Sequence, residues 1–292
     1  YTSKLLNAGK MKNSGLELQI AGTPIQTEDF QWNVGLNLTS QNNEVVELLK
    51  DEEGNTVVES INAGSTWAAD LRVQEGLPYM ALFGQDFVYD AGGNKLVDAD
   101  GNYQFTDDRV YLGSAIADWT GGFNTSFTYK NFTLSALFDF QVGGIIHSTS
   151  LQWSKYSGMH PETVSFNGES DTRANGMILP GVKADGSAND IRVDPQTYYQ
   201  TYWRRAAPNV YDASFVKFRD IRLSYAVPAA VLGKTPFTSL NLSAYGRNLG
   251  ILYSEVPYID PQVITGAGNA QGLENAQVPA TSSFGFNISA KF

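Results

Sequence analysis

The sequence predicts an all-β protein, and the pattern of its strands favours an antiparallel transmembrane β-barrel. Runs of about ten residues alternate between apolar and polar side chains, which is the period of a strand because successive side chains leave opposite faces of the backbone. One face of each run is rich in aliphatic and aromatic residues, and the other in Asn, Ser and Thr. The connections between the runs also differ in length, some being short and others long.

The clearest strands form a hairpin around Lys130 and Asn131. Two consecutive runs each place an apolar set on one face: Phe123, Thr125, Phe127 and Tyr129 in the first, and Phe132, Leu134, Ala136, Phe138 and Phe140 in the second. Almost nothing separates the two runs, so they predict a tight antiparallel hairpin. A soluble sandwich has the same alternation, and the hairpin alone does not decide between the two folds.

Two strands precede this hairpin. Residues 15–23 alternate, and Pro24 is expected to end that strand because proline lacks the N–H that a sheet requires. Residues 30–39 alternate most cleanly, with Phe30, Trp32, Val34, Leu36 and Leu38 on the apolar face. Between 40 and 118 we expect a short strand or helical turn at 45–49, a strand within 76–90, and turns across 90–101.

Three more strands follow a long segment, residues 143–213, that shows little regular alternation. In residues 214–225 the alternation changes phase at Arg219 and Asp220, which predicts a β-bulge. Residues 239–249 alternate again, and after the loop 254–281 the strand 283–292 ends on Phe292.

The connections and the aromatic residues favour a barrel over a sandwich. Short connections follow residues 23, 130 and 225, and long ones follow 142 and 253, as in outer-membrane barrels with short periplasmic turns and long extracellular loops. Aromatic residues gather at the short-turn ends of the apolar faces, as an interfacial girdle requires: Phe30, Tyr129, Phe132, Tyr225 and Phe292.

The composition excludes several classes of function. A net charge of −10 and a pI near 4.7 argue against a nucleic-acid partner, which needs clustered Lys and Arg. The absence of cysteine excludes disulfides, thiol catalysis and cysteine-ligated metals. No apolar stretch approaches the ~20 residues of a transmembrane helix. The chain begins with Tyr1 and reads as a mature chain or a fragment.

Several blocks resemble, in order, the SusC-like TonB-dependent outer-membrane transporters of Bacteroidetes (the SusC/RagA family). The resemblance begins near residue 13, and its blocks are NSGLELQIAGTPI, FQWNVGLNLTSQNNEVVEL, LGSAIADWTGGFNTSFTYKNFTLSALFDFQVGG, VYDASFVKFRDIRLSYAVP and AYGRNLGILYSEVPYIDPQV. The final aromatic, Phe292, is similar to the assembly signal of such barrels. The resemblance implies a 22-strand barrel, of which residues 1–292 are expected to be the carboxy-terminal part, without the plug domain.

The resemblance also implies a function and partners. It implies TonB-dependent import of a bulky nutrient, an oligosaccharide or oligopeptide, across the Gram-negative outer membrane. The implied partners are a SusD-like surface lipoprotein, TonB acting through the missing plug, and the outer-membrane lipid, in a dimer of transporter–lipoprotein pairs. Two alternatives remain open: a small stand-alone outer-membrane barrel serving as adhesin or pore, and a soluble glycan-binding β-sandwich.

Candidate substrate contacts lie on the polar strand faces and in the long loop. Asp139, Gln141, Tyr245 and Arg247 are expected toward the extracellular ends of their strands, where they would line a wet lumen. In the segment 143–213, aromatic residues including Trp153 and Trp203 have the chemistry to stack on sugar rings or to contact a lid protein. Packing of the loop against itself explains them equally well.

The sequence supports no enzyme, cofactor or metal site. His147 and His160 lie in the long loop without a ligand set around them, and are expected to be solvated. The acidic run Asp98-Ala99-Asp100-Gly101-Asn102 lacks the spacing of an EF-hand calcium loop, so a turn is expected there instead.

Overall fold

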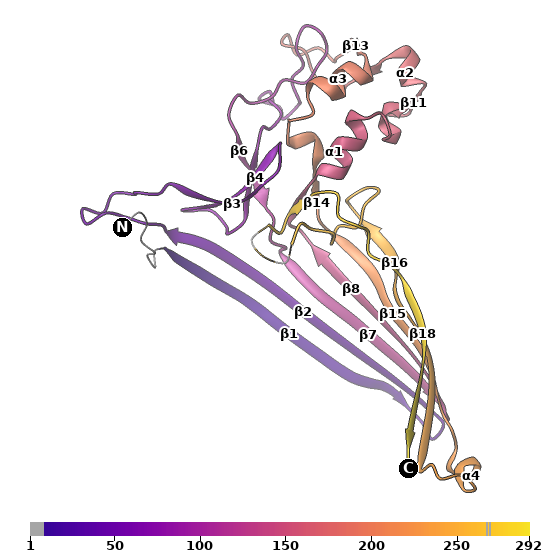
Figure 1. Cartoon of the computed structure of the whole chain (residues 1–292). Helices are drawn as coiled ribbons and strands as arrows, with labels where there is room; N and C mark the ends of the chain where they lie inside the picture. The colour runs from indigo at the N-terminus through magenta and orange to yellow at the C-terminus, as the bar shows by residue number, and fades with distance from the viewer. Residues whose placement is uncertain (1–8, 267, 269) are drawn as a thin grey trace.

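The computed structural model describes residues 9–266, 268 and 270–292, so the first eight residues of the predicted domain 1–292 lie outside the described part. The chain forms one large curved sheet with a folded cap of loops at one end (Figure 1). The sheet has seven strands in the order β1 (Lys10–Gln26), β2 (Phe30–Glu47), β7 (Trp119–Tyr129), β8 (Phe132–Val142), β15 (Phe215–Ala226), β16 (Ser239–Ser254) and β18 (Ser283–Lys291). All six pairings are antiparallel, which confirms the all-β prediction.

The predicted hairpin is confirmed residue by residue. Tyr129 pairs with Phe132, and only Lys130 and Asn131 stand between them. Lys130 adopts the left-handed region, with φ 52°, which lets the chain reverse within these residues.

Two irregularities interrupt the ladder, one unexpected and one predicted. The prediction that Pro24 ends the first strand is wrong: β1 continues to Gln26, and a register shift between Gly22 and Ile25 lets the chain pass the proline. A bulge tolerates a residue that cannot donate to the ladder. The predicted bulge at Arg219 is confirmed, because Phe218 pairs with Phe138 and Asp220 with Leu137, leaving Arg219 as the extra residue.

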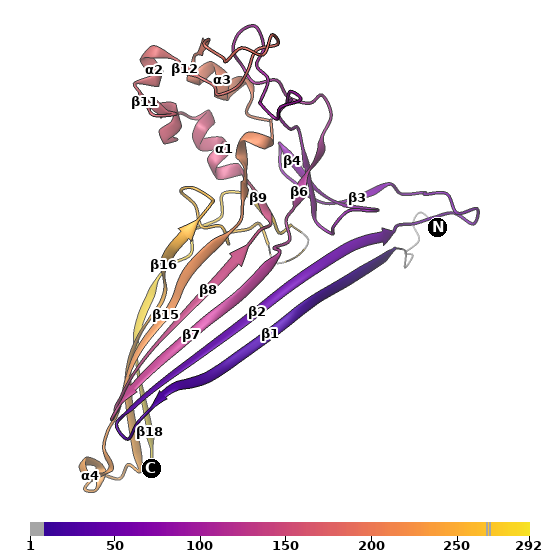
Figure 2. The ribbon, with the colours of Figure 1, turned by 180° about the vertical axis from the view of Figure 1, so that it is seen from behind.

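The two faces of the sheet differ as predicted. On the apolar face a row of aromatic cross-strand partners joins Phe30, Tyr129, Phe132 and Tyr225 near the short turns. The Phe132 and Tyr225 rings lie 4.6 Å apart. The short connections 27–29, 130–131 and 227–238, the last holding α4 (Ala229–Leu232), all lie at this end, and the long connections lie at the other (Figures 1 and 2).

The apolar face carries large exposed side chains. Phe284 and Phe286 are 77% and 87% exposed, and no second sheet covers this face in the described part of the chain. The β-sandwich alternative is therefore wrong, because a sandwich buries its apolar face. Among the described strands β1 and β18 are the two edges and do not pair with each other, so the sheet remains open.

The long connections fold into a compact cap, the loop subdomain, made of residues 48–118 and 143–214 (Figure 2). The predicted strand within 76–90 is β5 (Ala81–Gly84), and residues 45–47 extend β2. The described segment 143–213, which lacked alternation, holds three α-helices and two 3-10 helices. The other elements of the cap are β3 (Ser60–Ser65), β4 (Ala69–Gln74), β6 (Val110–Ser114), β9 (Ile145–Ser148), α1 (Thr149–Tyr156), η1 (Pro161–Thr163), β10 (Ser165–Phe166), β11 (Glu169–Ser170), α2 (Thr172–Asn175), β12 (Met177–Ile178), β13 (Arg192–Val193), α3 (Pro195–Thr201), η2 (Ala207–Asn209) and β14 (Val210–Asp212).

Separate apolar cores hold the cap together. One contains Phe87, Tyr103, Met177 and Tyr198, and another contains Leu71, Leu82 and Leu273. Leu273 belongs to β17 (Leu273–Glu274) in the last long connection, residues 255–282, which we call the strap. Across the described residues, no helix has the length and apolar character needed to cross a membrane.

Candidate functional site

The polar face carries a network of charges at its loop end. The Arg219 guanidinium donates from Nε and Nη2 to the two carboxylate oxygens of Asp139, each at 2.6 Å, and also contacts Gln262 of the strap. Such a bidentate ion pair fixes the orientation of both side chains. Asp139 therefore lies near the loop end, as predicted. Its carboxylate is already paired with Arg219 of the same sheet.

A second ion pair joins the sheet to the strap. Lys217 of β15 donates from Nζ to both oxygens of Asp260, each at 2.5 Å, and to Oε1 of Gln262 at 3.0 Å. Its side chain is only 1% exposed. A buried ammonium needs such partners because leaving it unpaired in a low-dielectric site is costly. The strap is thus fastened onto the polar face of the sheet.

Gln141 also has a local partner. Its Nε2 donates to the carbonyl oxygens of Gly143 at 3.3 Å and Ala213 at 3.2 Å. The side chain therefore holds the chain where β8 leaves the sheet. It also borders a cavity of about 240 Å³ between the sheet and strap residues such as Gln262.

Tyr245 and Arg247 lie lower on the sheet than the sequence suggested. The prediction placed them toward the extracellular end, but β16 continues to Ser254, so Tyr245 lies at mid-height, opposite Arg222. The guanidinium carbons of Arg247 and Arg222 lie 4.8 Å and 5.6 Å from the centre of the Tyr245 ring. Arg247 Nε lies 3.4 Å from Asp220 Oδ2.

Trp153 and Trp203 come together in the loop subdomain. Their ring centres lie 5.0 Å apart, and Trp67, from the connection between β3 and β4, lies 5.1 Å from Trp153 and 5.9 Å from Trp203. Tyr156 completes the group at 5.1 Å from Trp153. Trp67 is 55% exposed. We call these four residues the aromatic platform, because they present rings from three separate segments of the cap.

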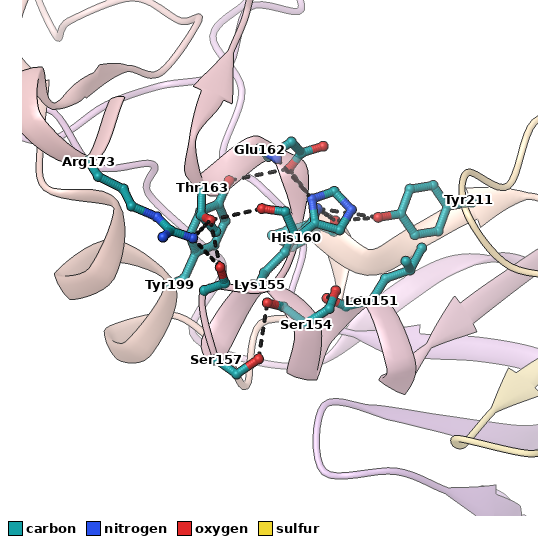
Figure 3. Close-up of polar contacts among 12 residues, drawn as sticks. Leu151, Ser154, Lys155, Ser157, His160, Glu162, Thr163, Arg173, Tyr199 and Tyr211 are labelled. Atoms are coloured by element: carbon teal, nitrogen blue, oxygen red, sulfur yellow. Dashed lines mark hydrogen bonds and ion pairs between the residues drawn. The ribbon is translucent and has the colours of Figure 1, made fainter. Parts of the chain in front are cut away.

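Next to the platform lies a polar cavity of about 300 Å³. Tyr156 belongs to both, and Lys155, Arg173, Asp194 and Gln200 are among the other lining residues. The Arg173 guanidinium donates to Thr163 Oγ1 at 2.9 Å and also contacts the Gly158 carbonyl oxygen. Figure 3 shows Lys155, Thr163 and Arg173 converging from α1, η1 and α2.

Lys155 is the centre of the buried polar contacts in Figure 3. Its ammonium lies 3.1 Å from Glu162 Oε2 and donates to the Pro208 carbonyl oxygen at 3.2 Å. Tyr199 donates to the same Glu162 oxygen at 3.2 Å. Burial, assisted by the Glu162 charge, raises the pKa of Tyr199 far above its usual range. The phenol therefore stays protonated and serves as a structural donor.

The prediction that both histidines are solvated is wrong. His147 and His160 are 0% and 2% exposed. Burial lowers the pKa of His147 to about 4, against the opposing pull of Glu274. Burial also lowers the pKa of His160, whose ring packs edge-on against Tyr258. No apolar periodicity in residues 143–213 indicates this burial.

Glu274 fastens the strap to the loop subdomain. Its carboxylate accepts from the hydroxyls of Ser148 and Ser150 at 2.6 Å and 2.5 Å, and from the Ser150 N–H at 2.9 Å. These groups begin α1, where free N–H groups and the helix dipole favour an anion. Because Asp260 of the strap binds Lys217 of the sheet and Glu274 of the strap binds the start of α1, the strap connects the two parts of the molecule.

The acidic run at 98–102 forms the turn that was expected. Asp98 Oδ1 accepts from the backbone N–H groups of Asp100 and Asn102, both at 2.9 Å. The same arrangement recurs at Asp90, which accepts from the N–H groups of Gly92 and Asn94 at 2.8 Å. No cluster of metal-ligating side chains occurs among the residues that the structure describes.

Sequence reasoning missed several residues of these sites. Trp67 stood alone in a region without alternation, and only the fold brings it to Trp153. Asp260 and Gln262 lie in a loop whose path the sequence does not indicate. Arg222 was detectable, because it occupies the polar parity of a predicted strand.

Comparisons with known proteins place this geometry in context. No family model matches the chain. TonB-dependent receptor P3 of Formosa agariphila is 26% identical over 100% of the chain, and TonB-dependent receptor P26 of the same organism is 27% identical over 99%. TonB-dependent receptor SusC of Bacteroides thetaiotaomicron is 25% identical over 75% of the chain. The chain spans about 30% of the length of P3 and P26.

Solved structures agree on the fold. A structure of the RagAB peptide transporter matches with a TM-score of 0.67 and 18% identity over 98% of the chain and 30% of the matched chain. The closed-closed state of the RagAB peptide importer matches with a TM-score of 0.66 and 19% identity. The open sheet is thus similar to part of a larger β-barrel. In sequence and fold the chain thus resembles the SusC-like TonB-dependent receptors.

Proposed function

We propose that the chain forms the carboxy-terminal part of the barrel wall of an outer-membrane importer. The two-faced sheet carries this proposal. Its apolar face, with large exposed side chains and an aromatic row near the short turns, fits lipid, and its polar face fits a hydrated lumen. Strands of a longer protein would pair with the free edges of β1 and β18 and complete a 22-strand barrel. The plug would lie in the part of the protein outside this chain.

The transported solute is proposed to be a bulky nutrient, an oligosaccharide or an oligopeptide. The names of the relatives support uptake driven through TonB, and the RagAB structures are described as those of a peptide importer. Asp139, Gln141, Tyr245 and Arg247 would border the path of the solute on the polar face. We assign no catalytic role to the chain, since its relatives are named as receptors and transporters.

The loop subdomain is proposed to meet the solute and a SusD-like surface lipoprotein outside the membrane. It lies at the end of the sheet with the long connections (Figure 1), which is the extracellular end in outer-membrane barrels. Trp67 is exposed, and Trp153 and Trp203 pack partly buried beside it; together they supply the rigid aromatic surface that dominates binding energy at interfaces. By analogy with the family, two such transporter–lipoprotein pairs would form a dimer.

Deletion of the full-length gene tests the proposed import. The deletion strain should lose growth on one class of oligosaccharide or oligopeptide and recover when the gene is restored. Restoration with a Trp67→Ala/Trp203→Ala variant should give weaker growth, whereas Met159→Ala, at a loop residue that is 82% exposed, should restore it fully. A deletion strain that takes up all these oligomers as well as the wild type would refute the import function.

A further inference from the structure

Among the described residues, Arg222 is a cation of the polar face that lies at mid-height and has no ion-pair partner. Lys217, Arg219 and Arg247 each lie within ion-pair distance of a carboxylate. For the Arg222 side chain, in contrast, the described part of the chain supplies neither a hydrogen bond nor an ion pair. Its partners across the ladder are Ser135 and Tyr245, neither of which is a carboxylate.

Tyr245 brings the two arginines of this site together. The guanidinium carbons of Arg222 and Arg247 both lie within 6 Å of its ring centre, at 5.6 Å and 4.8 Å. The ring lies across Gly285 of β18, where a Cβ atom would come within 2.6 Å of the tyrosine oxygen. The glycine thus makes room for the ring, and contact with the ring restricts the guanidinium groups.

The local charge does not balance. Asp220 lies 3.4 Å from Arg247 Nε and compensates one of the two guanidinium groups. The site of Arg222, Tyr245, Arg247 and Asp220 therefore carries a net positive charge within a protein whose overall charge is −10. Along a polar channel wall, such a charge raises the local concentration of anions.

We propose that Arg222 and Arg247 bind a carboxylate group of the solute as it passes along the polar face. This inference rests on the proposed import function and narrows the solute to an acidic oligomer. A planar guanidinium presents paired N–H donors that match the two oxygens of a carboxylate. The Tyr245 ring holds these donors in place before the solute arrives, which reduces the entropic cost of binding. Acidic sugars and acidic peptides both supply the required group.

Binding to the full-length receptor in detergent tests the proposal with matched probes. The probes are trigalacturonate against galactotriose, and triglutamate against triglutamine, measured by calorimetry. The wild type should bind at least one acidic probe more tightly than its neutral counterpart, and the responding pair tells sugar from peptide. Arg222→Gln should weaken binding of that acidic probe about tenfold, as expected for the loss of one charge-assisted contact, and leave the neutral probe unchanged.

Two further variants and one cell measurement complete the test. Arg222→Lys should retain part of the preference for the acidic probe, because the positive charge remains while the paired N–H donors of the guanidinium are lost. Arg192→Gln removes an exposed cation of the loop subdomain and should have no effect. Equal binding of acidic and neutral probes, no binding of either acidic probe, or an unchanged affinity in Arg222→Gln would overturn the proposal. Loss of folded receptor without a change in affinity would also overturn it, since Arg222 would then pair within the full-length protein. Failure of import would appear separately, as normal uptake by the deletion strain.

Discussion

Lys217 of the sheet and Asp260 of the strap form a buried ion pair in which Nζ lies 2.5 Å from both carboxylate oxygens. The two residues are 43 positions apart in the chain. The pair holds the strap against the polar face, close to the Asp139–Arg219 pair, and Glu274 holds the other end of the strap at the start of α1. The position of the loop subdomain relative to the sheet therefore depends on charged contacts at both ends of one connection.

Removing one partner of this pair should loosen the strap. Asp260→Ala leaves a buried ammonium without its counter-charge, which costs about 3–5 kcal/mol in comparable sites. We expect rapid proteolysis of the full-length protein between residues 255 and 282. Asp190→Ala is the matched control, because the Lys183–Asp190 pair at 2.7 Å is solvent-exposed on the Asp190 side and such pairs contribute about 0–1 kcal/mol. Equal protease resistance of wild type and Asp260→Ala would show that the pair does not fasten the strap.

Neighbouring residues of β2 test which face meets lipid. Leu36 pairs with Ile20 and Phe123 on the apolar face, and Asn37 pairs with Gln19 and Gly122 on the polar face. Leu36→Arg should lower the stability of the membrane-inserted protein by about 2–4 kcal/mol near the midplane of the bilayer, whereas Asn37→Arg should cost well under ~1 kcal/mol. Urea titration of the full-length protein in bilayers measures both. A larger loss at Asn37 than at Leu36 would reverse the assignment of the faces.

Acid should weaken the contact between β9 and the strap. Burial lowers the pKa of His147 from 6.5 to about 4, so the unfolded imidazole takes up a proton at a higher pH than the folded one. The stabilisation is therefore complete above pH 6.5 and is lost as the pH falls toward 4, by on the order of 3 kcal/mol at most. The lowered pKa of His160 acts in the same direction.

Hydrogen exchange of the β9 and β17 amides measures this effect. Exchange by local opening should accelerate between pH 6.5 and 4, after correction for the intrinsic pH dependence of exchange. A His147→Gln/His160→Gln variant should lack the acceleration, because neither position then titrates. The same acceleration in that variant would assign the pH dependence to other groups.

The sequence predicted the sheet better than the cap. Strict alternation in long strands identified the hairpin at Lys130, the polar and apolar faces and the bulge at Arg219, because each depends on local parity. The predicted strand end at Pro24 was wrong, because a register shift accommodates the proline within β1. The helices of 149–201 are short and are held by contacts from distant segments, so they leave no periodic pattern.

The residues of the candidate sites show the same contrast between features set by local strand parity and features set by distant contacts. Strand parity predicted that Asp139, Tyr245 and Arg247 lie on the polar face, and their places in β8 and β16 agree. The ion-pair partners of Asp139 and Lys217 depend on the bulge and on the path of the strap, which no local pattern indicates. Trp153 and Trp203 were recognised as aromatic residues of a long loop, but their contact with Trp67 is a property of the folded cap.

Spin labels along β8 test most directly whether this sheet is a barrel wall with lipid on one face and water on the other. The chain has no cysteine, so single cysteines can be introduced for labelling. In full-length protein in liposomes, labels at Leu134, Ala136 and Phe138 should be accessible to oxygen, which concentrates in lipid. Labels at Thr133 and Ser135 should instead be accessible to a water-soluble nickel complex. Alternation between the two reagents along consecutive residues is the predicted result, and the same reagent preference at both sets of positions would contradict it.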